Sequence, residues 1–374
     1  MPDCVVVGAG VFGSWTALRL RESGRSVALV DAFGPGNVKS SSGGASRVIR
    51  MGYGADEIYT RWSMRSLEAW KELFARVGRP HLFQHTGVLW TALKGHPHGE
   101  GSLAAFRRLG VPHEALSGEE VRRRYPTLRF AAEIIGILET ESGALLANRA
   151  VRAVAQVAAD SGVEVIDGAV AAFAENGRLD RIATDRGRTI EADIFVFACG
   201  PWLPKLFPQA AGGRIRVTRQ PVFYFDAPGI EMPVWIDFSD PHGGYTIPPV
   251  DGKSFKLALD RHGARFDPDK DSRTVTGEET AAARAFLAER FPALRDAPVV
   301  ETEVCQYEST SNGDFLIGRH RAMTNVWLVG GGSGHGFKHG PAVGEYVAAV
   351  IGGAPREARF SWASKGEVAA RTVY

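Results

Sequence analysis

Three glycines near the N-terminus have the spacing of a phosphate-binding turn. Gly8, Gly10 and Gly13 form G-x-G-x-x-G between an apolar run and an amphipathic segment, with Val11 and Phe12 inside the turn. In such a motif the glycines make a tight turn, let the backbone approach a pyrophosphate and allow close packing of helix on strand. The helix that follows presents unpaired N–H groups and the positive end of its dipole to the phosphates. The motif therefore predicts a site for phosphate groups.

The elements around this turn complete a dinucleotide site. Residues 5–7 predict a buried parallel strand, and residues 17, 18 and 20 form the inner face of the predicted helix. A second apolar run ends in Asp31, and an acid about 20 residues beyond the glycines can accept both ribose hydroxyls. Strand, helix, strand and acid in register predict nucleotide binding, and they leave open whether the dinucleotide is NAD or FAD.

Length and composition limit the class of protein. A chain of 374 residues usually forms two domains, and a net charge of +2 gives no reason to expect nucleic acid or a membrane surface as a partner. No apolar run approaches the ~18 residues of a membrane helix. The first strand begins within four residues of Met1, so we expect no signal peptide and a cytoplasmic protein. Cys4, Cys199 and Cys305 predict neither a disulfide framework nor a metal cluster.

The first half of the chain continues with loops and helices. Residues 32–52 form a loop rich in Gly and Ser that carries Arg47 and Arg50; it is either a solvated loop or one that runs along the cofactor. Amphipathic patterns predict helices at 56–77, 117–125 and 147–160, with short strands between 81 and 145 and a strand-like run at 162–173. The apolar strand at 193–202 ends in Gly200, where the chain either passes a cofactor or simply turns.

The second half is mostly β. Five strand-like runs lie between 217 and 310, interrupted by one helix at 278–290 that follows a capping-box pattern, Thr276-x-x-Glu279. Several strands with few helices suggest a large sheet that roofs a ligand cavity. A strand, a glycine loop and a helix then follow between 315 and 351, so the nucleotide-binding domain is expected to be discontinuous.

The order of these motifs resembles one family closely. The N-terminal turn, SSGGASRVIR, FACGPW, the pair Tyr245 and Lys256, CQYESTSNGDFLIGRH and GGGSGHGFK follow one another along essentially the whole chain. Together they resemble the FAD-dependent amine oxidases of the monomeric sarcosine oxidase and N-methyl-tryptophan oxidase type, within the D-amino-acid oxidase superfamily. The cysteine of C-x-Y and the S-G-H-G-F-K loop are the most diagnostic pieces.

The resemblance implies FAD and a two-domain fold. The expected fold class is α/β plus α+β, with a Rossmann-like FAD-binding domain and a second domain built on a large mixed or antiparallel sheet. The FAD-binding domain is expected at 1–80, 146–215 and 312–374, and the substrate-binding domain at 81–145 and 216–311. As implied cofactor contacts we name the N-terminal residues given above and Ser41, Ser42, Ser46, Arg47, Val170, Gly200, Trp202, Cys305, Gly331, Gly332, Gly334, His335, Gly336, Phe337 and Lys338.

Several of these residues match family positions with particular roles. Cys305 matches the cysteine that carries the flavin covalently, although an isolated cysteine on an apolar strand is more often a core residue. Lys256 matches a lysine that activates oxygen in the family. The other interpretation is that it is an ordinary solvated lysine on a strand, and the eleven-residue interval from Tyr245 favours the functional one. Gly331, Gly332 and Gly334 leave room for backbone N–H groups against the O2 edge of the flavin.

The remaining matched residues form the substrate pocket. Arg50 and Lys338 match the two cations that hold a substrate carboxylate, which Arg binds bidentately and Lys as a point charge. Arg47 matches an arginine near the opposite face of the flavin, and Tyr245 matches a tyrosine of the pocket.

Two positions depart from the family. Gly43 stands where some members have a histidine, and Asp260 stands at the histidine four residues past the lysine, with His262 two residues further on. An acid at 260 could pair with a cationic or hydroxyl-bearing substrate group. Both departures weaken the case for sarcosine itself as the substrate.

The resemblance implies an FAD-dependent oxidase of secondary (N-alkyl) amino acids. Hydride transfer from the substrate C–H to flavin N5 would give an imine, and O₂ would then be reduced to H₂O₂. The alternatives are a fructosyl-amino acid or cyclic imino acid oxidase, a flavin dehydrogenase with another acceptor, an NAD(P)-dependent dehydrogenase and a flavin-binding structural protein. The expected partners are a small amine and O₂, in a monomer or small homo-oligomer.

Overall fold

A six-stranded sheet carries the N-terminal turn. The computed structural model describes residues 1–130, 133–239, 243–250, 252, 254–261 and 263–368. The sheet has the order β18-β19-β12-β1-β2-β9, and every neighbouring pair is parallel except β18 with β19. Its strands are β1 (Cys4–Val7), β2 (Val27–Asp31), β9 (Glu164–Asp167), β12 (Ile194–Phe197), β18 (Leu316–Arg319) and β19 (Val326–Gly330). Three segments far apart in sequence therefore build one sheet.

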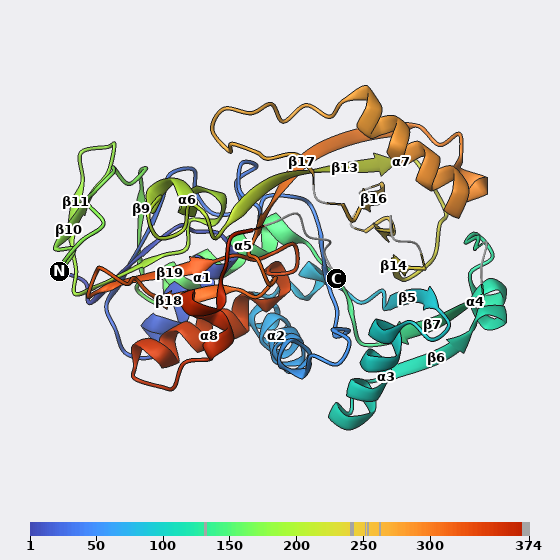
Figure 1. The fold of residues 1–374 in the computed structure, drawn as a ribbon, viewed down its shortest axis with the longest axis horizontal. Helices are drawn as coiled ribbons and strands as arrows, with labels where there is room; N and C mark the ends of the chain where they lie inside the picture. The colour runs from blue at the N-terminus through green and yellow to red at the C-terminus, as the bar shows by residue number, and fades with distance from the viewer. Residues whose placement is uncertain (131–132, 240–242, 251, 253, 262, 369–374) are drawn as a thin grey trace.

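Helices cover one face of this sheet and small β and helical pieces cover the other (Figure 1). Along β1 the side chains alternate, because Cys4 and Val6 pack on the helical face while Val5 and Val7 pack on the opposite face. The helical face carries α1 (Val11–Glu22), α5 (Ala147–Asp160) and α8 (Gly340–Ile351), and the other face carries β10 (Arg181–Ala183), β11 (Thr189–Glu191) and α6 (Leu203–Leu206). Burial on both faces explains the continuous apolar runs of the strands.

A second sheet of eight strands forms the other half of the molecule. Its order is β17-β13-β16-β15-β14-β5-β7-β6, and its pairs are antiparallel except β14 with β5. Its strands are β5 (Val88–Leu93), β6 (His113–Ser117), β7 (Ile134–Glu139), β13 (Arg216–Phe225), β14 (Val234–Phe238), β15 (Gly244–Ile247), β16 (Phe255–Leu259) and β17 (Val299–Ser309). In Figure 1 the long strands β13 and β17 lead from the middle of the molecule to α7 (Gly277–Arg290).

The register of the second sheet divides its residues between two faces. Phe255 and Leu257 pack with α7 in an apolar core, so Lys256 and Ala258 between them point to the other face. Ala258 is paired with Tyr245 across β15 and β16. On β13 and β17 the pair Gln220 and Cys305 belongs to the same face as these residues, because Lys256 is paired with Tyr224. This face is the one that meets the cavity described below.

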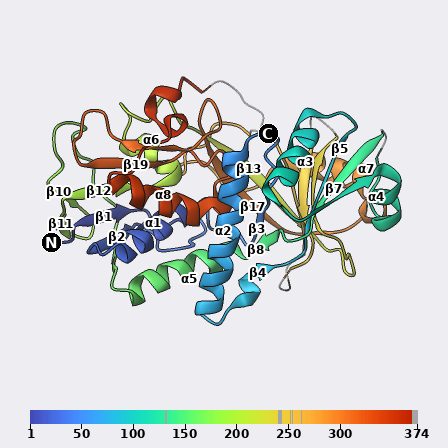
Figure 2. The same cartoon turned by 90° about the horizontal axis from the view of Figure 1, so that it is seen from below.

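A long helix stands between the two halves. Figure 2 shows α2 (Glu57–Arg76) upright between the strands of the first sheet and those of the second. A three-stranded sheet lies at its side, with the order β3-β8-β4 and the strands β3 (Arg47–Ile49), β4 (Phe83–Gln84) and β8 (Gly143–Leu145). The sheet pairs Arg47 with Leu145, so the loop after the nucleotide unit is held against a distant segment.

The expected fold class is confirmed, with two local corrections. The helices predicted at 56–77, 117–125, 147–160 and 278–290 are present, as α2, α4 (Gly118–Arg124), α5 and α7 with its capping box. The helix α3 (Pro97–Leu109) was not predicted, because Gly99 and Gly101 lower its intrinsic propensity; burial of Phe106 and a left-handed Gly110 at its end support it. The strand-like run 162–173 is too long, since β9 ends before Gly168, whose φ is +150°.

None of the described helices is long and apolar enough to cross a membrane.

Candidate functional site

A cavity of about 490 Å³ runs between the first sheet and the inner face of the second. It brings together residues from the N-terminal turn, the loop after β2, the second sheet and the loop before α8. The predicted site residues that line it are Gly8, Gly10, Val11, Phe12, Asp31, Ser41, Ser42, Arg47, Arg50, Val170, Gly200, Trp202, Tyr245, Asp260, Cys305, Gly332, Gly334, His335, Gly336, Phe337 and Lys338. Gly13, Ser46, Lys256 and Gly331 lie behind this wall. His262 lies outside the described residues.

The turn after β1 leaves no space for side chains. A Cβ atom at Gly13 would overlap the carbonyl oxygen of Gly8, and one at Gly8, whose φ is +103°, would overlap the carbonyl oxygen of Ala198. Helix α1 begins directly after this turn, and its first N–H group, on Val11, donates to Ser42 Oγ at 3.1 Å. The close-packed turn at a helix N-terminus fits the pyrophosphate of a dinucleotide.

Asp31 holds the turn from the end of β2. Its Oδ2 atom accepts the N–H group of Ala9 at 2.6 Å, and its Oδ1 atom accepts those of Phe33 and Gly34 at 2.8 Å each. Burial raises the pKa of this carboxyl group. A carboxylate has about four acceptor positions, so three backbone donors leave about one for a ligand. Asp31 therefore has fewer free acceptor positions than the sequence pattern predicts, since both ribose hydroxyls were expected to bind to it.

Two cations lie together at the other end of the cavity. The Arg50 guanidinium lies 4.4 Å from the centre of the Tyr53 ring and 4.8 Å from that of Trp90, and Lys338 Nζ lies 5.0 Å from the centre of the Tyr53 ring. Lys338 Nζ also donates to the carbonyl oxygen of His335 at 2.9 Å. Burial, with a smaller contribution from Arg50, holds the pKa of Lys338 well below its usual value. Two neighbouring buried cations indicate a site for an anion.

A buried acid, Glu139, holds the main chain and the tryptophan ring next to Arg50. Glu139 is fully buried; its carboxylate accepts the N–H groups of Met51 at 2.7 Å and Gly52 at 2.9 Å, and Nε1 of Trp90 at 2.7 Å. Arg50 in turn donates to the carbonyl oxygen of Gly52. Sequence reasoning missed Glu139 as a support, because its pairing with residues 88 positions earlier leaves no local signal.

Arg47 and Cys305 are in direct contact. Nη2 of Arg47 lies 3.0 Å from Sγ of Cys305 and donates to the carbonyl oxygen of Ser41 at 2.8 Å, while Nη1 donates to that of Ser46 at 2.8 Å. Both residues line the cavity, so the guanidinium group fixes the position of the Cys305 sulfur atom at its wall.

Lys256 is buried beside the cavity and does not reach its surface. Its side chain is 1% exposed, and Nζ donates to the carbonyl oxygen of Ser46 at 2.8 Å. Burial and the nearby Arg47 lower the pKa of Lys256 to about 7. The lysine therefore lies close to the site, behind the residues that line it.

Asp260 adds an acid to the end of the cavity that holds Arg50. It follows β16 and lines the wall, and its main-chain N–H group donates to the carbonyl oxygen of Gly243 at 2.9 Å. Burial raises its pKa to about 6, and the charge of Arg50 opposes that rise. Its charge also raises the pKa values of Tyr245 and Tyr307, which burial already raises. The cavity thus holds two cations and an acid at one end.

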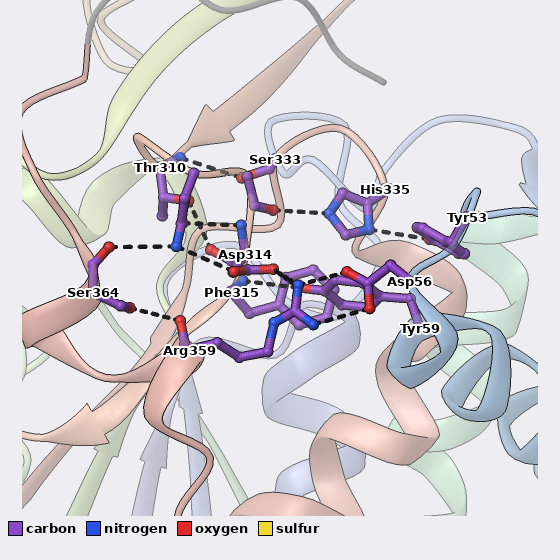
Figure 3. Close-up of polar contacts among 12 residues, drawn as sticks. Tyr53, Asp56, Tyr59, Thr310, Asp314, Phe315, Ser333, His335, Arg359 and Ser364 are labelled. Carbon is purple, nitrogen blue, oxygen red and sulfur yellow. Dashed lines mark hydrogen bonds and ion pairs between the residues drawn. The ribbon is translucent and has the colours of Figure 1, made fainter. Parts of the chain in front are cut away.

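The loop before α8 is held by a polar network (Figure 3). Arg359 bridges Asp56 and Asp314 at 2.6 and 2.7 Å, and the Tyr59 hydroxyl donates to Asp314 at 2.9 Å. The hydroxyl of Tyr53 lies 3.1 Å from Nδ1 of His335 and 2.7 Å from Nε2 of His339. These contacts join the start of α2, the turn after β17 and the C-terminal segment around the loop that carries Lys338.

Glu308 is a second residue that sequence reasoning missed. It lines the cavity and is 8% exposed. Burial raises the pKa of its carboxyl group to about 7. The N–H groups of Gly331 and Gly332 face this carboxyl group and partly offset its burial. That these N–H groups bind the O2 edge of a flavin stays a prediction.

Comparison with known proteins identifies relatives of the whole chain. The profile of the family described as FAD dependent oxidoreductase matches residues 3–350. The chain is 30% identical to monomeric sarcosine oxidase from Bacillus sp. (strain B-0618), covering 92% of this chain and 91% of that protein. It is 29% identical to human peroxisomal sarcosine oxidase, covering 92% and 90%.

A solved structure shows the same fold. L-proline dehydrogenase from P. horikoshii superposes with a TM-score of 0.81 at 24% identity, covering 93% of this chain and 92% of that one. The glycine turn, the half-buried acid Asp31 and the cavity fit the dinucleotide that the family name implies. The chain belongs to the family of FAD dependent oxidoreductases, and sarcosine oxidases are among its relatives.

Proposed function

We propose that the protein is an FAD-dependent oxidase of secondary (N-alkyl) amino acids. The observation that carries the proposal is the pair Arg50 and Lys338, which lie over one tyrosine ring in the cavity that begins at the dinucleotide turn. Bound FAD would supply a hydride acceptor for the carbon beside the substrate nitrogen, which would leave an imine for water to hydrolyse. O₂ would then take the two electrons together with two protons and become H₂O₂.

The protein's own contribution is to hold the amino acid in place. Arg50 and Lys338 would bind the carboxylate, and Tyr245 would close one side of the pocket. Asp260 would pair with a cationic or hydroxyl-bearing group of the substrate other than the reacting amine, since it lies at the same end of the cavity. Positioning of this kind can supply about 7–11 kcal/mol of a reaction barrier.

A substrate screen tests the proposal. The purified protein is offered N-methyl amino acids, fructosyl-amino acids and cyclic imino acids, and peroxide release is measured. We expect N-alkyl amino acids to react and their carboxamides to react far less, because the two cations require a carboxylate. Equal rates for acids and amides would contradict the proposal.

We also propose that Cys305 carries the FAD covalently through its sulfur. Its contact with Arg47 at 3.0 Å supports the proposal, because it holds the sulfur atom at the wall of the cavity that would receive the flavin. After acid precipitation the yellow colour should stay with the protein. Colour released into the supernatant would contradict the covalent bond and leave the proposed oxidation unaffected.

The position of Lys256 favours one alternative, a dehydrogenase that passes electrons to an acceptor other than O₂. Lysine at this site is proposed to promote oxygen reduction, yet its Nζ is bound to Ser46 and lies behind the cavity wall. Oxygen consumption compared with dye reduction separates the two functions. In an oxidase, Lys256→Met should slow reoxidation of the flavin far more than its reduction in stopped-flow experiments.

We further propose that the cofactor domain comprises residues 1–80, 146–215 and 312–374, and the substrate domain residues 81–145 and 216–311. The membership of the two large sheets supports this division, because the first sheet draws its strands only from the former segments.

A further inference from the structure

Glu308 is a buried carboxyl group that the proposed chemistry does not use. It is the penultimate residue of β17, and it lines the cavity while only 8% of its surface is exposed. Its Oε2 atom has no hydrogen-bond partner in the part of the chain that the structure describes. Leaving a buried polar atom without a partner costs about 1–3 kcal/mol. At the wall of a ligand cavity, such an atom indicates that the ligand supplies the partner.

The position of Glu308 is intermediate between the two ends of the cavity. The unpartnered Oε2 atom would lie 3.3 Å from a Cβ atom at Gly330, the last residue of β19, and the Oε1 atom would lie 3.9 Å from one at Gly200, which follows the strand paired with β1. It would lie 3.4 Å from a Cβ atom at Gly332, which opens the loop to Lys338. Its own strand carries Cys305 three residues earlier. The carboxyl group therefore lies between the phosphate-binding turn and the residues expected around the flavin ring.

The charge of this region decides which part of FAD fits. Burial raises the pKa of Glu308 to about 7, and the facing N–H groups of Gly331 and Gly332 only partly oppose it. The neighbouring Cys199 has a pKa raised by burial and further by the charges of Asp31 and Glu308, so the surroundings already carry negative charge. Phosphate groups are disfavoured beside such an acid, and the methyl edge of the flavin offers no hydrogen bond. Neutral hydroxyl groups suit it, because they both donate and accept.

We propose that Glu308 is a cofactor-binding residue whose carboxyl group hydrogen-bonds to a hydroxyl group of the ribityl chain, the part of FAD that joins its phosphates to its ring. Through this contact Glu308 sets how far the ring extends towards Arg50 and Lys338. The inference requires only that the chain binds FAD, and it is independent of the substrate that is oxidised.

The test measures FAD binding to apoprotein. The background is Cys305→Ser, in which binding is reversible whether or not the native thiol forms a bond. Dissociation constants are measured for FAD and for FAD analogues that each lack one ribityl hydroxyl group. Glu308→Leu should weaken FAD binding about tenfold, the size of one hydrogen bond to a buried group. Glu308→Gln, which can still donate and accept, should bind FAD within about threefold of the parent.

The coupling between variant and analogue decides the outcome. One analogue should bind the parent protein about tenfold more weakly than FAD binds it. The same analogue and FAD should bind Glu308→Leu equally well, because the contact is already lost in that variant. Glu301→Leu, on the same strand and away from the cavity wall, should leave all constants unchanged. If the affinity of every analogue relative to FAD falls by the same factor in the parent and in Glu308→Leu, the residue is not a ribityl ligand and the inference is wrong. Glu308→Ala provides the same comparison if the leucine variant does not fold.

Discussion

The phosphate-binding end of the cavity is built from backbone, whereas the substrate end is built from charged side chains. At the first end Gly8 and Gly13 leave no room for a Cβ atom, and Asp31 accepts three main-chain N–H groups. At the second end Arg50 and Lys338 come from segments almost 300 residues apart. The first end is a local structure, and the second exists only after the whole chain has folded.

The two ends also differ in how many groups are held against their preferred ionisation. At the first end burial raises the pKa of Asp31, whose carboxylate accepts three main-chain N–H groups. At the second end burial lowers the pKa of Lys338 and of the nearby Lys256, and it raises the pKa of Asp260 to about 6. Groups perturbed in this way are concentrated at functional sites. Substitutions at the phosphate end should therefore damage the fold and the cofactor together, while those at the substrate end should damage activity and spare the fold.

The largest effect is expected at Gly13. Gly13→Ala would place a Cβ atom on the carbonyl oxygen of Gly8, so the turn cannot form and stability should fall by about 3 kcal/mol or more, with loss of bound flavin. Thermal denaturation and flavin content measure both effects. The control is Gly213→Ala, where a Cβ atom would meet nothing within 4 Å. A Gly13→Ala protein with normal flavin content would show that the close packing of the turn is not required.

A smaller and more selective effect is expected at Arg50. Arg50→Met removes one of the two cations and keeps an unbranched side chain beside Trp90, so flavin content should be unchanged and kcat/KM for an amino acid should fall about 100-fold. Steady-state kinetics with an amino acid and with its carboxamide measure the effect. An equal fall for both compounds would contradict carboxylate binding by Arg50.

The difference between the ends explains what could be predicted from the sequence. The glycine turn, Asp31 and most strands follow from patterns within about 30 residues, a range over which periodicity and turn chemistry are informative. Cys305, Arg50, Lys338 and Asp260 were assigned through a family resemblance, and the structure brings them to one cavity.

Long-range pairing accounts for what was missed. Glu139 could not be predicted from the sequence because its partners lie far away along the chain. Glu308 could not be predicted because one of its oxygens has no partner in the part of the chain that the structure describes. Lys256 lies on the sheet face that meets the cavity, and its contact with Ser46 follows from the packing of a loop against that face, which no strand pattern contains. Helix α3 was missed because burial overrode the low propensity of its glycines.

The pH dependence of activity should report Asp260. With a pKa of about 6, the group is mostly neutral below that pH and ionised above it, so a substrate whose cationic or hydroxyl-bearing side group pairs with the carboxylate should react faster as pH rises. We expect kcat/KM to rise about tenfold from about pH 5 to about pH 7 because of this group. Asp260→Asn should abolish the rise, whereas titration of the substrate amine is common to both proteins. A rise that survives in Asp260→Asn would assign it to another group.

The smallest effect is expected at Ser333, where the loop that carries Lys338 combines both kinds of construction. Ser333 has a φ of 47°, a left-handed conformation that favours glycine, and its hydroxyl accepts the N–H group of Thr310 at 3.2 Å and donates to the carbonyl oxygen of Gly331 at 2.9 Å. Ser333→Ala keeps the backbone strain and loses both hydrogen bonds, so its stability should fall by about 1–2 kcal/mol. Ser333→Gly also loses the hydrogen bonds but relieves about 1 kcal/mol of strain, so its stability should fall less. Denaturant unfolding of the flavin-loaded protein measures the order, parent above glycine above alanine. An alanine variant as stable as the parent would mean that the hydroxyl does not hold the loop, and the position of Lys338 would then depend on the network around Tyr53 alone.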